Sequence, residues 1–156
     1  EADNDCFPSP IILILSGIDS MAYLDMPPNQ KDVGRHDFVK WAERYMKFPC
    51  KEQLTGLDLY GARCSMLHSY GALSKLSREG QCRLIGYVDQ AIPEVQYAPN
   101  VSKELVIVSI PALAQAFFNG IDEFLVHLFD NPEKAKVAEE RLRGFVQVMP
   151  CEDRPC

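Results

Sequence analysis

The sequence predicts a mainly α-helical protein, a bundle of about five helices with a small antiparallel ribbon of two strands. Three observations support this fold class. Apolar residues recur at helical spacing over most of the chain. Capping residues, prolines and glycines mark where helices begin and end, and two short runs in the later half are rich in β-branched residues. The 156 residues are enough for one domain that buries its own core.

Two apolar helices are expected in the first third of the chain. Ser9 followed by Pro10 has the order of an N-cap and a first-turn proline, and the helix that begins there should end near Leu24. Its first turns are apolar on nearly all sides, which is typical of a core helix. Prolines and a glycine in 26–34 predict a loop, after which a second helix should run from about His36 to Lys47.

A third helix is predicted from about Gly56 to Gly71. Thr55 and Asp58 stand three residues apart in the order of a capping box, in which the hydroxyl accepts an early helical amide and the acid accepts the amide of the cap residue. Gly71 permits the left-handed turn that commonly ends a helix. Near its end this helix carries three reactive side chains: Arg63, His68 and Tyr70.

The later half of the chain should hold the ribbon and two more helices. Residues 82–89 and 104–110 are typical of strands, and the prolines and polar residues between them predict a long hairpin connection, so we expect antiparallel pairing. A short helical turn is expected within 72–80. From Pro111 apolar residues return at helical spacing, and a shorter charged helix should follow over 132–143.

Composition limits the function classes. The net charge of −6 and the pI near 5.0 argue against avid nucleic-acid binding, because phosphate binding normally recruits a basic surface, although a local positive groove is compatible with them. The six cysteines are scattered without a Cys-x-x-Cys pair, so we expect no metal site and no cofactor. They fit the thiols of a reducing cytoplasm, with a Cys151–Cys156 bridge left open.

No membrane segment is expected. The strongly apolar run Ile11–Leu15 is far too short to span a bilayer, and no signal peptide is recognisable in the sequence. We therefore expect a cytoplasmic protein.

Arg63, His68 and Tyr70 spell Arg-x4-His-x-Tyr, which resembles the signature of the HEPN superfamily of small helical bundles, Arg-x4-6-His. The resemblance covers roughly residues 8–72, and the surrounding LYGARCSMLHSYG resembles bacterial HEPN-like proteins. In the ribonuclease members the arginine and histidine cleave RNA without metal, generally in a dimer whose motif helices meet. In some bacterial toxin members the tyrosine is nucleotidylated by a partner antitoxin.

The resemblance implies a single HEPN-like domain over 1–156, with Arg63 and His68 catalytic and Tyr70 both a substrate contact and a site of regulatory modification. Physical chemistry agrees, since a guanidinium matches phosphate oxygens and an imidazole exchanges protons near neutral pH. Five residues separate the arginine and histidine by about 140° around a straight helix. Either the helix distorts, or two copies share a cleft. We therefore expect a homodimer with these helices near its axis and Tyr70 accessible at the cleft mouth.

Two acids complete the candidate substrate-binding set. Asp19 interrupts the apolar stripe of the first helix and could point into the same cleft as Arg63, as acids commonly do in proteins that resemble this one. Asp58 is the second. Simpler roles stand beside these: a structural salt bridge for Arg63 and for Asp19, a helix N-cap for Asp58, and a C-terminal helix cap for His68.

The function expected from this pattern is a metal-independent endoribonuclease, or an RNA- or nucleotide-binding protein, of a bacterial toxin–antitoxin or defence system, with an antitoxin as a partner. The alternative is a non-catalytic HEPN-like module for dimerisation or interaction with another partner, which the acidic net charge favours. A third interpretation is a helical domain whose motif matches by chance.

Overall fold

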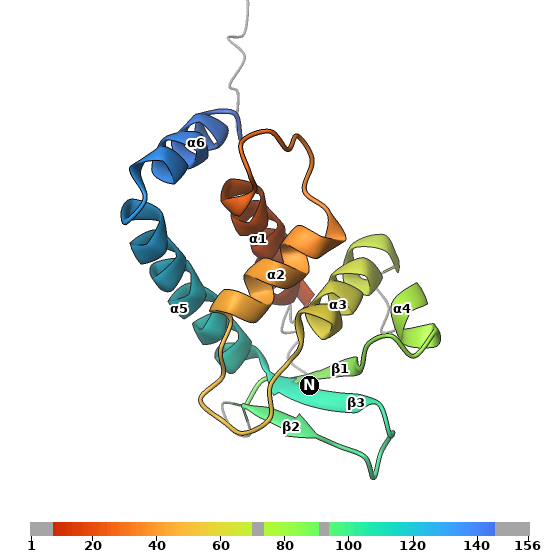
Figure 1. Cartoon of the computed structure of the whole chain (residues 1–156). Coiled ribbons are helices and arrows are strands. Elements are labelled where there is room, and N and C mark those ends of the chain that lie inside the picture. Colours follow the sequence, from red (N-terminus) through yellow and green to blue (C-terminus); the bar gives the residue numbers. More distant parts are fainter. Residues whose placement is uncertain (1–7, 70–73, 91–93, 146–156) are drawn as a thin grey trace, which may run out of the picture.

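The computed structural model describes residues 8–69, 74–90 and 94–145, without the side chains of His68 and Ser69. The described chain is mainly helical with one small sheet, as the sequence predicts (Figure 1). Its helices are α1 Pro8–Asp25, α2 Arg35–Tyr45, α3 Gly56–Ser69, α4 Lys75–Arg78, α5 Ile110–Phe129 and α6 Pro132–Arg143. Its strands are β1 Leu84–Val88, β2 Val95–Tyr97 and β3 Leu105–Ser109.

Local capping fixes most of these boundaries. At the start of α3 the Thr55 amide donates to Asp58 Oδ2 at 2.9 Å, and the Asp58 amide donates to Thr55 Oγ1 at 3.1 Å, which confirms the predicted capping box. Asn131 accepts the Lys134 amide at 3.1 Å at the start of α6, and Gly144 follows its last residue. Observed and predicted helix ends therefore agree to within about two residues.

The sheet differs from the predicted ribbon. Strand β3 lies between the other two, parallel to β1 and antiparallel to β2. The antiparallel pairing predicted for 82–89 with 104–110 is therefore wrong. The stretch between these segments contains a strand of its own, β2, which forms the hairpin with β3 and leaves the opposite edge of β3 for β1.

The core lies between α1, α2, α3 and α5 on one side of the sheet (Figure 1). Its fully buried side chains include Leu15, Ile18, Phe38, Trp41 and Phe124. Helix α5 follows β3 directly, because Ser109 ends the strand and its hydroxyl caps the helix by accepting the Ala112 amide at 3.2 Å. Helix α6 then folds back against α1 and α5.

Helix α3 is packed on several sides at close range. Every residue from Gly56 to Leu67 is buried or half-buried. A Cβ atom at Gly56 would lie 2.7 Å from the Val39 carbonyl oxygen, and one at Gly61 would overlap Cys82 Sγ. These two glycines therefore let the α3 backbone approach α2 and the segment that leads into β1.

Candidate functional site

The structure joins two of the predicted site residues across 44 positions of sequence. Arg63 on α3 donates from Nε to Oδ2 of Asp19 on α1 at 2.8 Å. Their side chains remain 25% and 21% exposed, so the pair sits at the edge of the core and partly in solvent. A structural salt bridge was the simpler role predicted for each of these residues, and the structure pairs them with each other.

The environment of Arg63 favours a permanent positive charge. Burial lowers the pKa of its guanidinium, but the hydrogen bond and negative charge of Asp19, together with the interaction with Cys64, raise the pKa above its ordinary value. The guanidinium carbon also lies 5.9 Å from the centre of the Tyr60 ring, one turn earlier on α3. The arginine is thus held by an acid on α1 and an aromatic face on its own helix.

The remaining motif residues are placed only in part. The backbone of α3 is helical through Ser69, so His68 follows Arg63 by five helical positions, about 140° around the axis. The side chain of His68 and the whole of Tyr70 lie outside the described residues. No contact between the arginine and these two side chains is therefore described, and the predicted accessibility of Tyr70 stays a prediction.

Asp58 is a structural anchor in this fold. It is 2% exposed and accepts the Arg83 amide at Oδ1 at 2.8 Å. Its Oδ2 accepts Arg83 Nε at 3.0 Å and Nη2 at 2.7 Å, besides the Thr55 amide of the capping box. Both carboxylate oxygens are occupied by the protein, which favours the cap interpretation over contact with a substrate.

Sequence reasoning missed Arg83, which organises this cluster. Its Nη1 also donates to Glu52 Oε1 at 2.5 Å and its Nη2 to the Gln53 carbonyl at 2.6 Å. Burial lowers the pKa of Arg83, but the hydrogen bonds to Asp58 and Glu52 and the negative charges of these two acids together raise it above its ordinary value. An arginine just before a strand carries no sequence signal of such a role, because its acidic partners lie 25 and 31 positions away.

Two classes of feature are absent from the described part of the chain. Across residues 8–69, 74–90 and 94–145, no three His, Cys, Asp or Glu side chains gather closely enough to hold a metal ion. Within the same ranges, no helix is long and apolar enough to cross a membrane.

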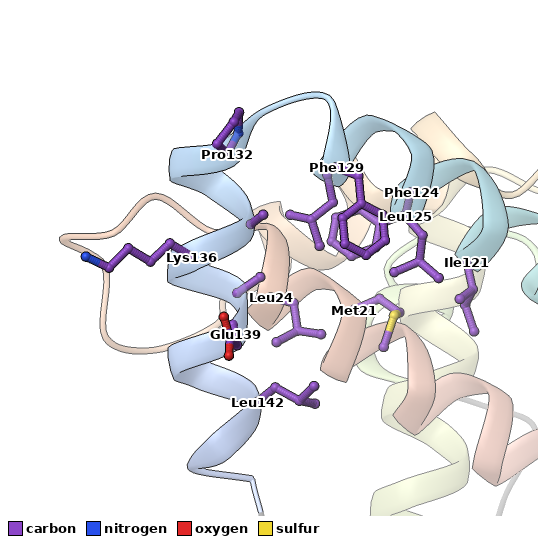
Figure 2. A pocket seen from close by; sticks show the side chains of 13 residues that line it. Met21, Leu24, Ile121, Phe124, Leu125, Phe129, Pro132, Lys136, Glu139 and Leu142 are labelled. Atoms are coloured by element: carbon purple, nitrogen blue, oxygen red, sulfur yellow. The ribbon is translucent and has the colours of Figure 1, made fainter.

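A pocket of about 690 Å³ lies between α1, α5 and α6 (Figure 2). Met21 and Leu24 of α1 and Phe124 of α5 line it from the core side. The Lys136 side chain extends away from the pocket, and Glu139 is paired with Arg143, so the hollow itself is apolar (Figure 2). Its other lining residues are Ile121, Leu125, Leu128, Phe129, Pro132, Ala135, Ala138 and Leu142.

Comparison of the chain with protein-family models, with curated proteins and with solved structures finds no match. The HEPN resemblance therefore rests on the sequence features alone and stays a prediction.

Proposed function

We propose that this chain is a non-catalytic, HEPN-like interaction module. The observation that carries the proposal is the set of exposed apolar side chains on α5 and α6: Leu125, Phe129 and Leu142 line the pocket of α1, α5 and α6, and Phe118 is exposed elsewhere on α5. Large apolar side chains that gather on one surface are typical of sites where proteins bind other proteins.

The motif helix supports the same proposal. Asp19 supplies the negative charge that a phosphate would otherwise bring to Arg63, and displacing it would cost the ion pair. Asp58 is committed to Arg83, and the net charge of −6 disfavours approach of a polyanion. On this account Arg63 stabilises the contact of α1 with α3.

In a second candidate function, the motif residues act on a ligand. The chain would then be a homodimeric, metal-independent ribonuclease or nucleotide-binding protein of the HEPN kind, regulated by an antitoxin that modifies Tyr70. One observation favours it. The ion pair with Asp19 uses Nε of a guanidinium that is partly exposed, so the two Nη groups are not engaged by that carboxylate. In this candidate Arg63 stabilises charge on the phosphate and His68 transfers protons during attack by the ribose 2′-OH.

Incubation with single-stranded RNA in excess EDTA separates the two candidates. We expect the wild-type chain at micromolar concentration to leave the RNA intact. Fragments ending in 2′,3′-cyclic phosphate, formed by wild type and lost in both Arg63→Ala and His68→Ala, would overturn the proposal and establish the second candidate. Arg143→Ala is the matched control, because it removes an arginine from an exposed pair with Glu139 on α6.

A further inference from the structure

The pocket between α1, α5 and α6 is bordered by exposed apolar side chains on both sides. Residues of α5 and α6 form its two walls, and Met21 and Leu24 of α1 lie between them (Figure 2). On the α5 wall Phe129 is 72% exposed, and on the α6 wall Leu142 is 56% exposed. Helix α6 has 12 residues, so its wall extends for about 18 Å. We call this surface the α5–α6 groove and define it by Met21, Leu24, Leu125, Phe129 and Leu142.

The shape and the chemistry of the α5–α6 groove suit an α-helix. A helix with its side chains is about 10–12 Å across, so it fills the hollow and also covers the outer sides of the rim residues. A small molecule that fills only the pocket of about 690 Å³ would leave the outer sides of Phe129 and Leu142 in water. An extended peptide would leave backbone amides unpaired against apolar walls, whereas a helix pairs its own. The groove therefore favours the apolar side of a helix, whose anchors recur at spacings of three and four residues.

Acidic side chains flank the groove on both walls. On α5, Asp122 comes seven residues before Phe129 and lies within about 20° of it around the helix axis. On α6, Glu133 and Glu140 lie within about 60° of Lys136, which lines the pocket. The three carboxylates are exposed, and among the described residues none of them has an ion-pair partner.

The lysine and arginine side chains of the same two helices are mostly engaged within the chain. Lys134 is paired with an acid on α1, and Arg143 with an acid one turn earlier on α6. Arg141 donates to backbone carbonyls near the end of α1 and just beyond it. Among the described lysines and arginines of α5 and α6, this leaves Lys136 without a partner. The unpaired charge along the groove is therefore negative on balance.

We infer that the α5–α6 groove binds an amphipathic helix of a partner protein, and that the polar side of this helix is basic. The inference rests on the proposed function and specifies its partner. Lysines or arginines beside the apolar anchors approach Asp122 on one wall and Glu133 or Glu140 on the other. The same carboxylates and the net charge of −6 disfavour a second copy of this chain, an anionic lipid surface and a nucleic acid.

A pair of model peptides tests the inference. Both are amphipathic helices of about 18 residues with the same leucine side, and the polar side carries lysine in one and glutamate in the other. Fluorescence anisotropy measures their binding to the full chain. We expect the lysine peptide to bind with a micromolar Kd that rises with salt, and the glutamate peptide to bind at least about 10-fold more weakly.

Variants of the groove separate this binding from a general attraction of cations to an acidic protein. Phe129→Ser and Leu142→Ser should each raise the Kd of the lysine peptide about 10-fold. Val101→Ser is the matched control, since Val101 is an equally exposed apolar residue in the connection between β2 and β3, and it should leave the Kd unchanged. Circular dichroism of every variant checks that the fold is retained.

Two charge variants test the polarity of the rims. Asp122→Lys should raise the Kd of the lysine peptide about 5-fold, and Lys136→Glu should lower it by a similar factor, because each changes a charge beside the bound helix. Glu104→Lys is the control. It changes the net charge as much as Asp122→Lys does, but Glu104 is an exposed residue just before β3, so it should have little effect.

Three results would overturn the inference. They are a lysine peptide that does not bind at about 100 µM, binding indifferent to both Phe129→Ser and Leu142→Ser, and equal binding of the two peptides. If the fluorescent probe N-phenyl-1-naphthylamine binds at one per chain where neither peptide does, the pocket is a site for a small apolar ligand. In each of these cases the interaction-module proposal stands as long as the wild-type chain leaves RNA intact. RNA cleavage that depends on both Arg63 and His68 overturns the proposed function whatever the peptides do.

Discussion

Helix α3 and helix α5 expose opposite chemistry. Around α3 the charged groups are paired within the chain, Arg63 with Asp19 and Asp58 with Arg83, while glycines let neighbouring segments approach closely. On one side of α5, Phe118, Leu125 and Phe129 are exposed to solvent. The sequence motif lies on α3, but Arg63 and Asp58 of this helix are paired with other residues of the chain. Among the described residues, α5 carries the largest share of the exposed large apolar side chains, which is why we propose that the function lies there.

The largest effect is expected when a charged group that holds α3 in place is removed. Asp58→Ala should lower the free energy of unfolding by about 3 kcal/mol, because it leaves the half-buried Arg83 without its main partner and removes half of the capping box. Urea unfolding measures the change. Thr55→Ala is the control, since it removes only the capping hydroxyl and should cost about 1 kcal/mol. An Asp58→Ala variant as stable as wild type would show that α3 is not held by its charges.

The close approach of α3 to its neighbours can be tested with a single methyl group. Gly61→Ala should cost about 2 kcal/mol, because the new Cβ meets Cys82 Sγ in a tightly packed site. Thermal or urea unfolding reports it. Gly86→Ala is the matched control, since its Cβ would lie at ordinary contact distance, 3.5 Å from the nearest atom. Cys82→Ala in the Gly61→Ala background should restore much of the loss, and a clash located elsewhere would leave the double variant unimproved.

The Arg63–Asp19 pair should contribute less, because both side chains are partly exposed and screened by solvent. A double-mutant cycle with Arg63→Ala and Asp19→Ala should give a coupling energy of about 0.5–1 kcal/mol that decreases with salt. The Arg143–Glu139 pair on α6 provides the comparison, and its coupling should be smaller because it is far more exposed. A coupling at Arg63 no larger than at Arg143 would remove the structural explanation for the motif arginine.

The smallest effect is expected between α2 and α5. Tyr45 is buried, and within the described residues its hydroxyl has no hydrogen-bond partner, so Tyr45→Phe should leave stability at neutral pH unchanged or slightly higher. Burial raises the pKa of Tyr45 in the folded chain. A raised pKa gives stability that is present below the unfolded value of about 10 and is lost as pH rises above it, so the variant should lose less stability above about pH 10 than wild type.

Urea unfolding at pH 7 and near pH 10.5 measures both parts of this prediction. Tyr97→Phe is the control, because the Tyr97 hydroxyl donates to the Lys103 carbonyl at 2.6 Å and its removal should cost stability at pH 7. A Tyr45→Phe variant that is clearly less stable at pH 7 would mean that the buried hydroxyl has a partner.

Local signals in the sequence were sufficient for the helices and insufficient for the sheet. A cap such as Asn131 followed by Pro132 acts within one turn, so it can be recognised without knowing the fold. The side of β3 on which β1 lies is decided by competition with β2, a three-residue strand with no clear pattern of its own.

The candidate site shows the same difference between local and long-range interactions. The capping box of Thr55 and Asp58 is local and was predicted. A structural salt bridge was predicted for Arg63 and for Asp19 separately, and the structure pairs the two with each other. Arg83 was missed, because its pairing with Asp58 depends on how the sheet docks against α3. The catalytic roles of Arg63 and His68 stay predictions, as do the roles of Tyr70.

The position of Arg83 also affects which parts of the molecule unfold together. It lies one residue before β1 and binds the first turn of α3, so a single side chain joins the sheet to the helical layer. The sheet cannot separate from α3 without breaking the ion pair and the hydrogen bonds between Arg83 and Asp58. Partial unfolding between β1 and α3 is therefore disfavoured. We expect the amide protons of β1 and of the first turns of α3 to exchange with solvent in one cooperative event.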